Sequence, residues 1–373
     1  MTSSFTLGDK PNIWLTKNDP IPLMLSVAES LHVGDEELIM AHLASAHSIG
    51  LGPKVDPIHL YTTGRSGSGK GHCASATLRM FPEAVAIPLA SFSPKAFHYA
   101  ANSKDTKLDG RVIHIPEVTI VGQDEDKLGL IRILTDSSSE SKRGEHWTVN
   151  DKREPLKLKV QGRFVIWMNS VTPLPDEEVK NRFLIGNPNE TDSQDLQVQQ
   201  RQTNKLALLG QFENEGELKF CREVNQYILS EVIDDVIIPQ ARHIHFPHTK
   251  NRRLYPMFLT TVKAVTKMRF SQREEVAVVG NGKTINALLA TPDDVTVAIW
   301  IFNRILSVTV SQASQQALDL LKHIPDESGN AVSKNGLADL TGYSADWCYR
   351  KCKELLGANL VRSDTRDRQL YYW

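Results

Sequence analysis

The amino-acid sequence predicts an α/β fold built on a mostly parallel sheet. Two observations support this prediction: apolar strands alternate with longer segments, and a glycine-rich turn follows the first strand. The segments between the strands are long enough for crossover helices or inserted hairpins. The apolar strand at 112–115 suits the buried centre of a sheet. The strand candidates are residues 58–62, 84–88, 111–115 and 163–168.

The composition is that of an ordinary globular protein, long enough for two or three domains. The 373 residues are 40% hydrophobic and 23% charged, with a formal net charge of -1, so any nucleic-acid surface must be a local basic patch. We find no leader pattern and no apolar run of about 18 residues, and therefore expect a cytoplasmic protein without a membrane partner. The four cysteines fit a reducing compartment. A zinc site at Cys348 and Cys352 would lack a second ligand pair nearby in sequence, so no metal site is predicted.

A glycine-rich turn directly follows the first strand candidate. It reads Gly64, four residues, then Gly69-Lys70, and a helix-compatible stretch comes next. The backbone N–H groups of such a loop curl around a triphosphate, the lysine reaches the β and γ phosphates, and the helix dipole adds positive charge. Gly71 stands where a Ser or Thr hydroxyl would bind Mg²⁺, so the motif predicts nucleotide binding more strongly than hydrolysis. The alternative is a turn without a ligand. The predicted contacts are Gly64, Ser66, Gly67, Ser68, Gly69, Lys70, Gly71 and His72.

Polar residues near the ends of the later strands are the candidates for catalysis. Glu117 follows a buried strand and can activate an attacking water, although Pro116 occupies the position of the usual acidic partner. Asn169 ends the next strand and can orient that water. Arg182 precedes another apolar piece and can project into a neighbouring subunit's site to stabilise phosphate charge. The alternatives are a plain strand end for Glu117 and a surface salt bridge for Arg182.

The remaining patterns divide the chain into four parts. Residues 145–162 alternate around a polar turn, which predicts a β-hairpin with Lys152 and Arg153 at its tip. Helical spacing recurs before the glycine-rich turn and again after about residue 205. We therefore expect an N-terminal helical segment, a nucleotide-binding core, a helical region and a separate C-terminal unit. Their predicted bounds are 1–55, 56–204, 205–308 and 309–373.

The C-terminal unit has the pattern of a winged helix-turn-helix. A helix is followed by a turn with Gly342, a second helix and a closing hairpin. The recognition helix is expected at 344–356, with Arg350, Lys351 and Lys353 facing DNA phosphates. A protein-docking role is the alternative, because winged helices also bind proteins.

The order of these motifs resembles the AAA+ ATPases of the helicase clade with a presensor hairpin, which includes minichromosome maintenance helicases. A closer resemblance is to primase-associated ATPases of phages, plasmids and mobile elements. Their Ser-x-x-Ala-x-x-Tyr pattern is matched at 93–99, and their Ile-Arg-x-Leu pattern at 131–134. The segment 253–271 is similar to the family's sensor-two helix, and 290–295 to its next helix start. The similarity covers roughly residues 57–305.

The resemblance implies an α/β P-loop AAA+ core with a parallel sheet and presensor β-hairpin, a helical lid at 205–308 and the winged helix. It implies ATP and Mg²⁺ as cofactors, with Lys70 on phosphate. It further implies Glu117 as the catalytic acid, Asn169 as sensor one, Arg182 as a finger acting in trans and Arg253 (or Arg252) as sensor two. The family's hairpin lines a central channel, so Lys152 and Arg153 would contact the DNA backbone.

We interpret the sequence as an ATP-dependent hexameric ring motor that acts on single-stranded or forked DNA. It would be helicase-like, would serve replication of a mobile element or phage, and would have a primase or polymerase as a candidate partner. The alternative is an ATP-gated DNA-binding scaffold or loader with weak or no hydrolysis, which the replaced magnesium ligands favour. A chaperone or transcription activator on the same core is disfavoured by the winged helix and the basic hairpin tip. The sequence leaves open the polarity of translocation, the ring size and the choice between DNA and RNA.

Overall fold

The structure is a computed structural model of the chain. It describes residues 10–90, 93–102, 107–117, 125–136, 145–149, 153–160, 162–171, 176–207, 214–246, 252–280, 283–311, 315–325, 328–357, 360–366 and 369–373. No helix within these ranges is both long and apolar enough to cross a lipid bilayer.

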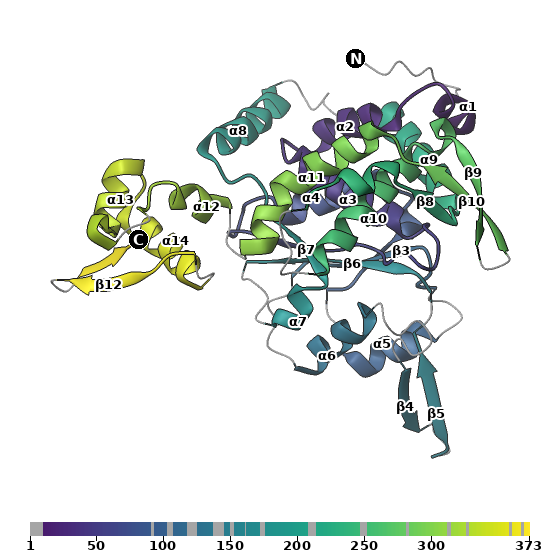
Figure 1. Ribbon diagram of the computed structural model, residues 1–373, viewed down its shortest axis with the longest axis horizontal. Coiled ribbons are helices and arrows are strands. Elements are labelled where there is room, and N and C mark those ends of the chain that lie inside the picture. The colour runs from purple at the N-terminus through teal and green to yellow at the C-terminus, as the bar shows by residue number, and fades with distance from the viewer. Residues whose placement is uncertain are drawn as a thin grey trace.

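A parallel sheet of five strands lies at the centre of the molecule, as predicted (Figure 1). Strand β1 (His59–Thr63) pairs in parallel with β6 (Phe164–Ser170) on one side and with β7 (Phe183–Gly186) on the other. Beyond β6 lie β3 (Arg111–Ile115) and the short edge strand β2 (Ala86–Pro88). All five carboxyl ends therefore meet at the same edge of the sheet, where ligands of open parallel sheets bind.

One face of the sheet is covered by helices from distant parts of the sequence. A single apolar cluster joins strand residues such as Leu60 and Trp167 to helices before residue 50 and helices after residue 214. The apolar core thus runs across the boundaries expected at 55 and 204, and the four-part division stays a prediction. The helices on this side are α1 (Pro11–Leu15), α2 (Pro20–Leu31), α3 (Glu36–Ser48), α4 (Lys70–Arg79), α9 (Glu215–Ser230), α10 (Leu254–Met268) and α11 (Pro292–Ser311).

The opposite face carries a second apolar cluster, which includes Tyr61, Met168 and Phe183 from the strands. Helices α5 (Pro94–Ala101) and α6 (Glu125–Leu134) and the short α7 (Glu177–Lys180) lie on this side. The alternation follows the strand period of two, since Leu60 and Trp167 enter one cluster while Tyr61 and Met168 enter the other.

Two β features extend beyond the central sheet. The predicted hairpin is present as β4 (Glu145–Val149) and β5 (Pro155–Lys159), which pair antiparallel and project from the body (Figure 1). The region expected to be helical also contains a small sheet, so that expectation was incomplete. Its strands are β8 (Asp235–Ile237), β9 (Glu275–Gly280) and β10 (Lys283–Leu289). Val276 and Val278 alternate with other residues in β9, and the sequence Gly-Asn-Gly at 280–282 is a hairpin signal.

The polar stretch after β7 forms helix α8 (Asp192–Ala207), which stands out from the body. Short 3-10 turns lie at Glu83–Val85, Pro239–His243, Phe270–Gln272 and Ser328–Asn330.

The C-terminal unit lies beside the main body and has an apolar cluster of its own (Figure 1). Helix, turn at Gly342, second helix and hairpin follow in the predicted order. Cys348 and Cys352 are buried in this cluster as free thiols. The elements are α12 (Gln315–Leu321), β11 (Val332–Ser333), α13 (Lys334–Thr341), α14 (Ala345–Gly357), β12 (Ser363–Arg366) and β13 (Gln369–Tyr372).

Candidate nucleotide-binding site

The glycine-rich loop joins the carboxyl end of β1 to the first residue of α4. Gly67 and Gly69 have φ of 83° and 87°, a conformation that residues with a Cβ adopt only with strain. Gly69 caps the helix and Lys70 is its first residue, so the unpaired N–H groups of the first helical turn face the loop. This geometry is that of an anion site for phosphate groups.

Neighbouring strand ends hold the loop in place. The Gly64 N–H donates to the Ser170 carbonyl at 3.3 Å, and the Arg65 N–H donates to Oε1 of buried Glu190 at 2.7 Å. The Arg65 side chain also pairs with Asp195 on α8. Lys70 Nζ donates to the carbonyl of Arg65 at 3.1 Å, which keeps the ammonium inside the curve of the loop.

The predicted loop residues differ in their surroundings. Ser66 and His72 are exposed, and Gly71 is partly buried with open space where a Cβ would lie. The Ser68 hydroxyl is buried and has no hydrogen-bond partner among the described residues. A buried hydroxyl without a partner costs free energy, so this group is suited to bond a ligand.

A cavity of about 410 Å³ opens beside the loop, between the end of α2 and α8. Two histidines meet at its wall: His32 Nδ1 lies 2.8 Å from His72 Nδ1, and His32 Nε2 lies 3.0 Å from the buried carboxylate of Asp35. The volume is sufficient for a nucleoside, and polar groups converge on it. The lining residues from α8 and its approach are Asn189, Gln194, Asp195, Val198, Arg201, Gln202 and Lys205.

Glu117 and Asn169 lie at the same edge of the sheet as the loop. Glu117 is exposed just after β3. Its charge acts on Tyr61 of β1: burial of the Tyr61 side chain, with a smaller effect of the Glu117 charge, raises the pKa of Tyr61 to about 12. Asn169 is fully buried on β6, next to Thr62 of β1. Its Nδ2 group lies 3.2 Å from Nε2 of His114, while its Oδ1 has no hydrogen-bond partner among the described residues.

Arg182 lies at the opposite edge of the sheet, just before β7. It is only 6% exposed, and its guanidinium donates to Glu178 at 2.5 Å and to the carbonyl of Arg132 at 2.7 Å. The carboxylate of Asp136 lies 3.5 Å away. In the single chain, therefore, Arg182 is turned into an internal ion-pair cluster.

A second cavity, of about 370 Å³, also lies at this opposite edge, where residues 54–59 lead into β1. Arg182 lines it together with Arg252 and Arg253, which come just before α10. Lys54 and Lys263 also line this cavity, which we call the basic pocket. The structure thus brings together the arginines that the sequence suggested separately, and it separates them from Lys70.

The residues predicted to contact DNA are placed unevenly. Arg153 is exposed near the hairpin turn with φ of 63°, and Lys152 lies outside the described residues. Arg350 and Lys353 are exposed on α14. Lys351 is half-buried and pairs with Glu354 at 3.2 Å, so it faces away from the surface that the other two share.

Sequence reasoning missed several residues that build the site, among them His32, Asp35, His114 and Glu190. Glu190 follows the carboxyl end of β7 in the run Asn187-Pro188-Asn189-Glu190, and the rule that polar residues beyond strand ends form the site could have found it. His32 and Asp35 precede the first strand, and no motif indicates their approach. Among the residues that the structure describes, no group of three or more His, Cys, Asp or Glu could hold a metal ion.

A comparison with protein families agrees with the assignment of residues 64–70 as a phosphate-binding loop. Residues 8–231 match the family described as MTBMA_p00010 P-loop domain. The uncharacterized protein MTBMA_p00010 of Methanothermobacter marburgensis (strain Marburg) is 23% identical over 357 residues, covering 90% of this chain and 43% of the relative. The chain therefore spans less than half the length of that relative.

Two solved structures are also similar at low identity. A full-length MCM homolog from Methanopyrus kandleri is 14% identical with a TM-score of 0.46, covering 82% of this chain and 63% of that chain. The Thermotoga maritima RuvB Holliday junction branch migration motor is 14% identical with a TM-score of 0.33, covering 92% and 94%.

Proposed function

Because the chain belongs to the MTBMA_p00010 P-loop domain family, we propose that it is an ATP-dependent motor of the AAA+ class that acts on DNA as a ring of identical copies. The ring is expected to be a hexamer, with a helicase-like role in replication of a mobile element or phage and a primase or polymerase as partner. ATP would lie with its phosphates on the loop at 64–70 and its base in the neighbouring cavity of about 410 Å³.

The separation of Lys70 from the basic pocket is the observation that carries this proposal. The loop follows the end of β1, whereas the pocket lies at its start, where His59 contributes to the lining. Four residue steps along a strand span about 13 Å, before the length of the loop is added. Arg253 therefore has no path to phosphates held by its own Lys70. A triphosphate on a second copy is the anion that suits Arg182 and Arg253, and such a head-to-tail contact closes into a ring.

The chemistry of the proposed site is phosphoryl transfer to water. Lys70 and the loop N–H groups hold the β and γ phosphates. Glu117 takes a proton from the attacking water while the water oxygen bonds to the γ phosphorus. The bond to the bridging oxygen breaks, and its electron pair leaves with the diphosphate. Asn169 orients the water, and a guanidinium from the neighbouring copy offsets the developing charge.

The residues present fit the nucleotide better than they fit a magnesium ion held by protein. Positive φ at Gly67 and Gly69, the helix start and the buried Ser68 hydroxyl all suit phosphate. Gly71 and Pro116, in contrast, bring no side-chain oxygen to the positions where ligands are expected. Mg²⁺ would therefore arrive on the triphosphate itself, and no step above depends on it.

DNA binding is proposed for the projecting hairpin and for the C-terminal unit. Arg153, and Lys152 next to it in the sequence, would meet the DNA backbone in the channel of the ring. Arg350 and Lys353 on α14 would contact phosphates if the C-terminal unit acts as a winged helix, whereas Lys351 is already paired with Glu354. Each such contact is independent of sequence and weakens with salt.

A subunit-mixing experiment tests the shared site. Lys70→Ala removes the loop cation, and the double variant Arg252→Ala/Arg253→Ala removes the two exposed arginines of the basic pocket. Each variant alone should lose ATP turnover. Random mixing of the two should restore activity at about one interface in four, because an intact loop then meets an intact pocket.

The opposite result is equally clear. If the arginines acted on the nucleotide of their own chain, no mixture of the two variants would regain turnover, and the shared-site proposal would be wrong. Arg242→Ala is the matched control, since Arg242 is exposed and does not line the pocket. It should leave turnover unchanged.

A second candidate function is an ATP-gated DNA-binding scaffold or loader with little or no hydrolysis. Gly71 and Pro116 favour this alternative, because both positions lack the expected magnesium ligands. Steady-state hydrolysis with Mg²⁺ separates the two functions, with Glu117→Gln as the control. Turnover that Glu117→Gln abolishes excludes a pure scaffold, whereas ring assembly on DNA without any turnover supports it.

A further inference from the structure

The hairpin β4–β5 carries a large aromatic side chain in an unusual place. Trp147 is 65% exposed and Val149 is 56% exposed, and both lie on the same face of β4. Exposing an indole to this extent forgoes burial of a side chain of 150–250 Å² at roughly 25 cal/mol per Å². An exposed aromatic of this kind on a projecting element marks a binding surface.

The other face of the hairpin is the one that packs on the body. Leu158 is 5% exposed and lies on the opposite face of the ribbon from Lys157, its neighbour in β5. The hairpin is therefore anchored through one face while the Trp147 face stays outward. Folding does not require Trp147 for the core, since it belongs to no apolar cluster.

A lysine is paired with this tryptophan across the two strands. Trp147 lies directly opposite Lys157, and Lys157 Nζ is 5.5 Å from the centre of the indole ring. Such a cation–π pair holds the ring in a defined orientation and places a positive charge over one of its faces, which leaves the other face for a ligand.

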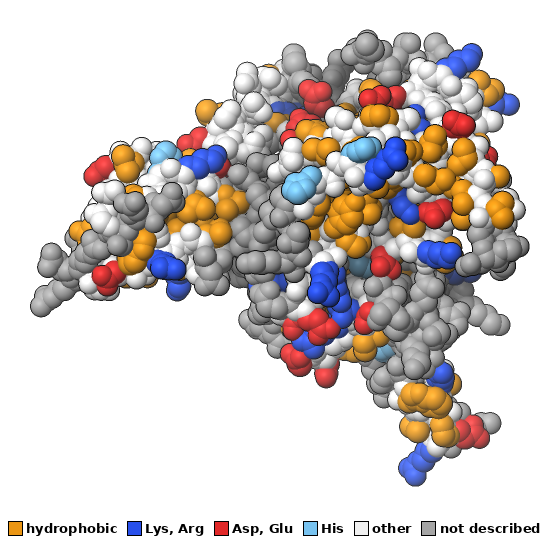
Figure 2. All heavy atoms as spheres, in the orientation of Figure 1, with side chains coloured by type: hydrophobic (Ala, Val, Ile, Leu, Met, Phe, Trp, Pro, Cys, Tyr) orange, Lys and Arg blue, Asp and Glu red, His pale blue; other side chains and the backbone are white. Residues whose placement is uncertain are grey.

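The hairpin extends away from the sheet (Figure 1). Figure 2 shows hydrophobic side chains gathered on this projection with basic side chains at both of its ends. Arg153 is exposed beside the turn. An exposed aromatic ring with a lysine over it and an arginine farther along the same hairpin offers both a stacking surface and positive charge to a single nucleic-acid strand.

We propose that Trp147 is a stacking platform for one base of an unpaired nucleic-acid strand, with Lys157 and Arg153 on the flanking phosphates. Bases within a duplex are stacked on one another and have no free face, so the site takes single strands only. The inference rests on the proposed action on DNA and adds the residue that distinguishes unpaired from paired strands.

Binding of fluorescent oligothymidine and of a blunt duplex, at two salt concentrations, tests this inference. Trp147→Ala should weaken oligothymidine binding about 5- to 150-fold, the range of one base–aromatic stack, while duplex binding stays unchanged. Trp147→Phe should retain most of the affinity and Trp147→Leu should not, since leucine is apolar without being aromatic. Lys157→Ala should reduce the slope of log affinity against log salt by about 1, whereas Trp147→Ala should not change it.

The controls separate this inference from the proposed function. Val279→Ala, on the β9–β10 hairpin, removes another exposed apolar side chain and should change nothing. If Trp147→Ala binds oligothymidine as tightly as the wild type does, the stacking site is wrong, whereas the proposed action on DNA still stands. Failure of the wild type to bind any nucleic acid would overturn both. A change of oligomeric state in Trp147→Ala, with oligothymidine affinity unaltered, would identify Trp147 as a subunit contact instead.

Discussion

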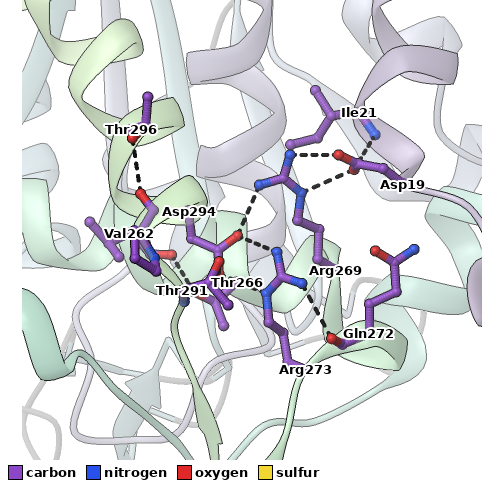
Figure 3. A network of polar contacts seen from close by, with 11 residues as sticks. Asp19, Ile21, Val262, Thr266, Arg269, Gln272, Arg273, Thr291, Asp294 and Thr296 are labelled. Carbon is purple, nitrogen blue, oxygen red and sulfur yellow. Dashed lines mark hydrogen bonds and ion pairs between the residues drawn. The ribbon is translucent and has the colours of Figure 1, made fainter. Parts of the chain in front are cut away.

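Arg269 donates to Asp294 at 2.9 Å although that carboxylate is wholly buried, at 0% exposure (Figure 3). The same guanidinium donates two further hydrogen bonds, of 3.0 and 2.6 Å, to the carboxylate of Asp19, which lies 250 residues earlier in the sequence. Arg273 also donates to both oxygens of Asp294, and the Thr291 N–H adds a bond of 3.0 Å. The start of α2, the end of α10 and the start of α11 are thereby fixed together.

Asp294→Asn should destabilise the fold by about 3–5 kcal/mol, because it leaves the buried guanidinium of Arg269 and the partly buried one of Arg273 without their shared carboxylate. Urea unfolding, followed by circular dichroism, measures this loss. Asp293→Asn is the matched control, since Asp293 is the exposed neighbour on the same helix turn. A loss for Asp294→Asn no larger than that for Asp293→Asn would contradict the prediction.

The same pair predicts part of the acid sensitivity. Burial opposes ionisation of Asp294, but hydrogen bonds from Arg273, Thr291 and Arg269 outweigh it and hold the pKa below the ordinary value of 3.8. A carboxyl with a depressed folded-state pKa contributes stability above its unfolded pKa, and this is lost as pH falls through the folded value. Unfolding free energy measured between pH 5 and pH 2 should therefore fall less steeply in Asp294→Asn than in the wild type.

Lys267→Met should stabilise the protein, by roughly 1–4 kcal/mol as for other buried ionic groups replaced by apolar ones. Lys267 is fully buried and its Nζ has no hydrogen-bond partner among the described residues. Burial lowers the pKa of Lys267 to about 7. The charge of Glu231 opposes this shift by a smaller amount, and the charge of Arg163 adds to it. His47, which faces the lysine, is kept neutral because burial lowers its pKa to about 3.

The stability gained by Lys267→Met should depend on pH. Between about pH 7 and the ordinary value of 10.5 the unfolded chain holds a proton that folded Lys267 has released, so wild-type stability rises with pH there. The gain from Lys267→Met should accordingly be larger at pH 6 than at pH 9. Lys263→Met is the control, because Lys263 on the same helix pairs with Asp235 at 2.6 Å and should show no such gain.

Gly71→Ser should lower the Mg²⁺ concentration that ATP turnover requires. A Cβ at Gly71 would meet no atom within 4 Å, and its φ is not in the left-handed region, so serine fits without strain. One added oxygen ligand of about 1 kcal/mol would lower the Mg²⁺ concentration for half-maximal turnover about fivefold. Gly71→Ala, which adds bulk without oxygen, should leave it unchanged. An equal effect of both variants would show that packing, not coordination, is responsible.

His114→Leu should slow turnover about 5- to 10-fold without weakening ATP binding, since it removes the acceptor that orients the Asn169 amide. Burial lowers the pKa of His114 to about 4, so the ring is neutral near pH 7 and its Nε2 can accept from Asn169 at 3.2 Å. His114→Gln keeps an acceptor and should retain most turnover. Equal losses in both variants, or a parallel loss of ATP affinity, would show that His114 only supports packing.

The sequence alone determined what local patterns can encode. The parallel α/β sheet followed from apolar runs that alternate with helical spacing, and the loop at 64–70 followed from glycines placed where positive φ is needed. The hairpin at 145–162 followed from its two-residue alternation. Lys70, Glu117 and Asn169 were predicted because each lies at or just beyond the carboxyl end of a strand, and parallel strands bring these ends to one edge.

Tertiary structure decided everything that depends on which distant segments meet. Sequence spacing says nothing about the approach of His32 and Glu190 to the loop from distant parts of the chain. It says equally little about the contact of Asp19 with Arg269 across 250 residues. The hairpin of the small sheet was missed although its sequence carries a turn signal, because the segment lies within a region whose spacing is otherwise helical. The direction of β1 alone placed Arg253 at one end and Lys70 at the other. Side-chain chemistry is local and can be read along a chain, but the distance between two sites is a property of packing.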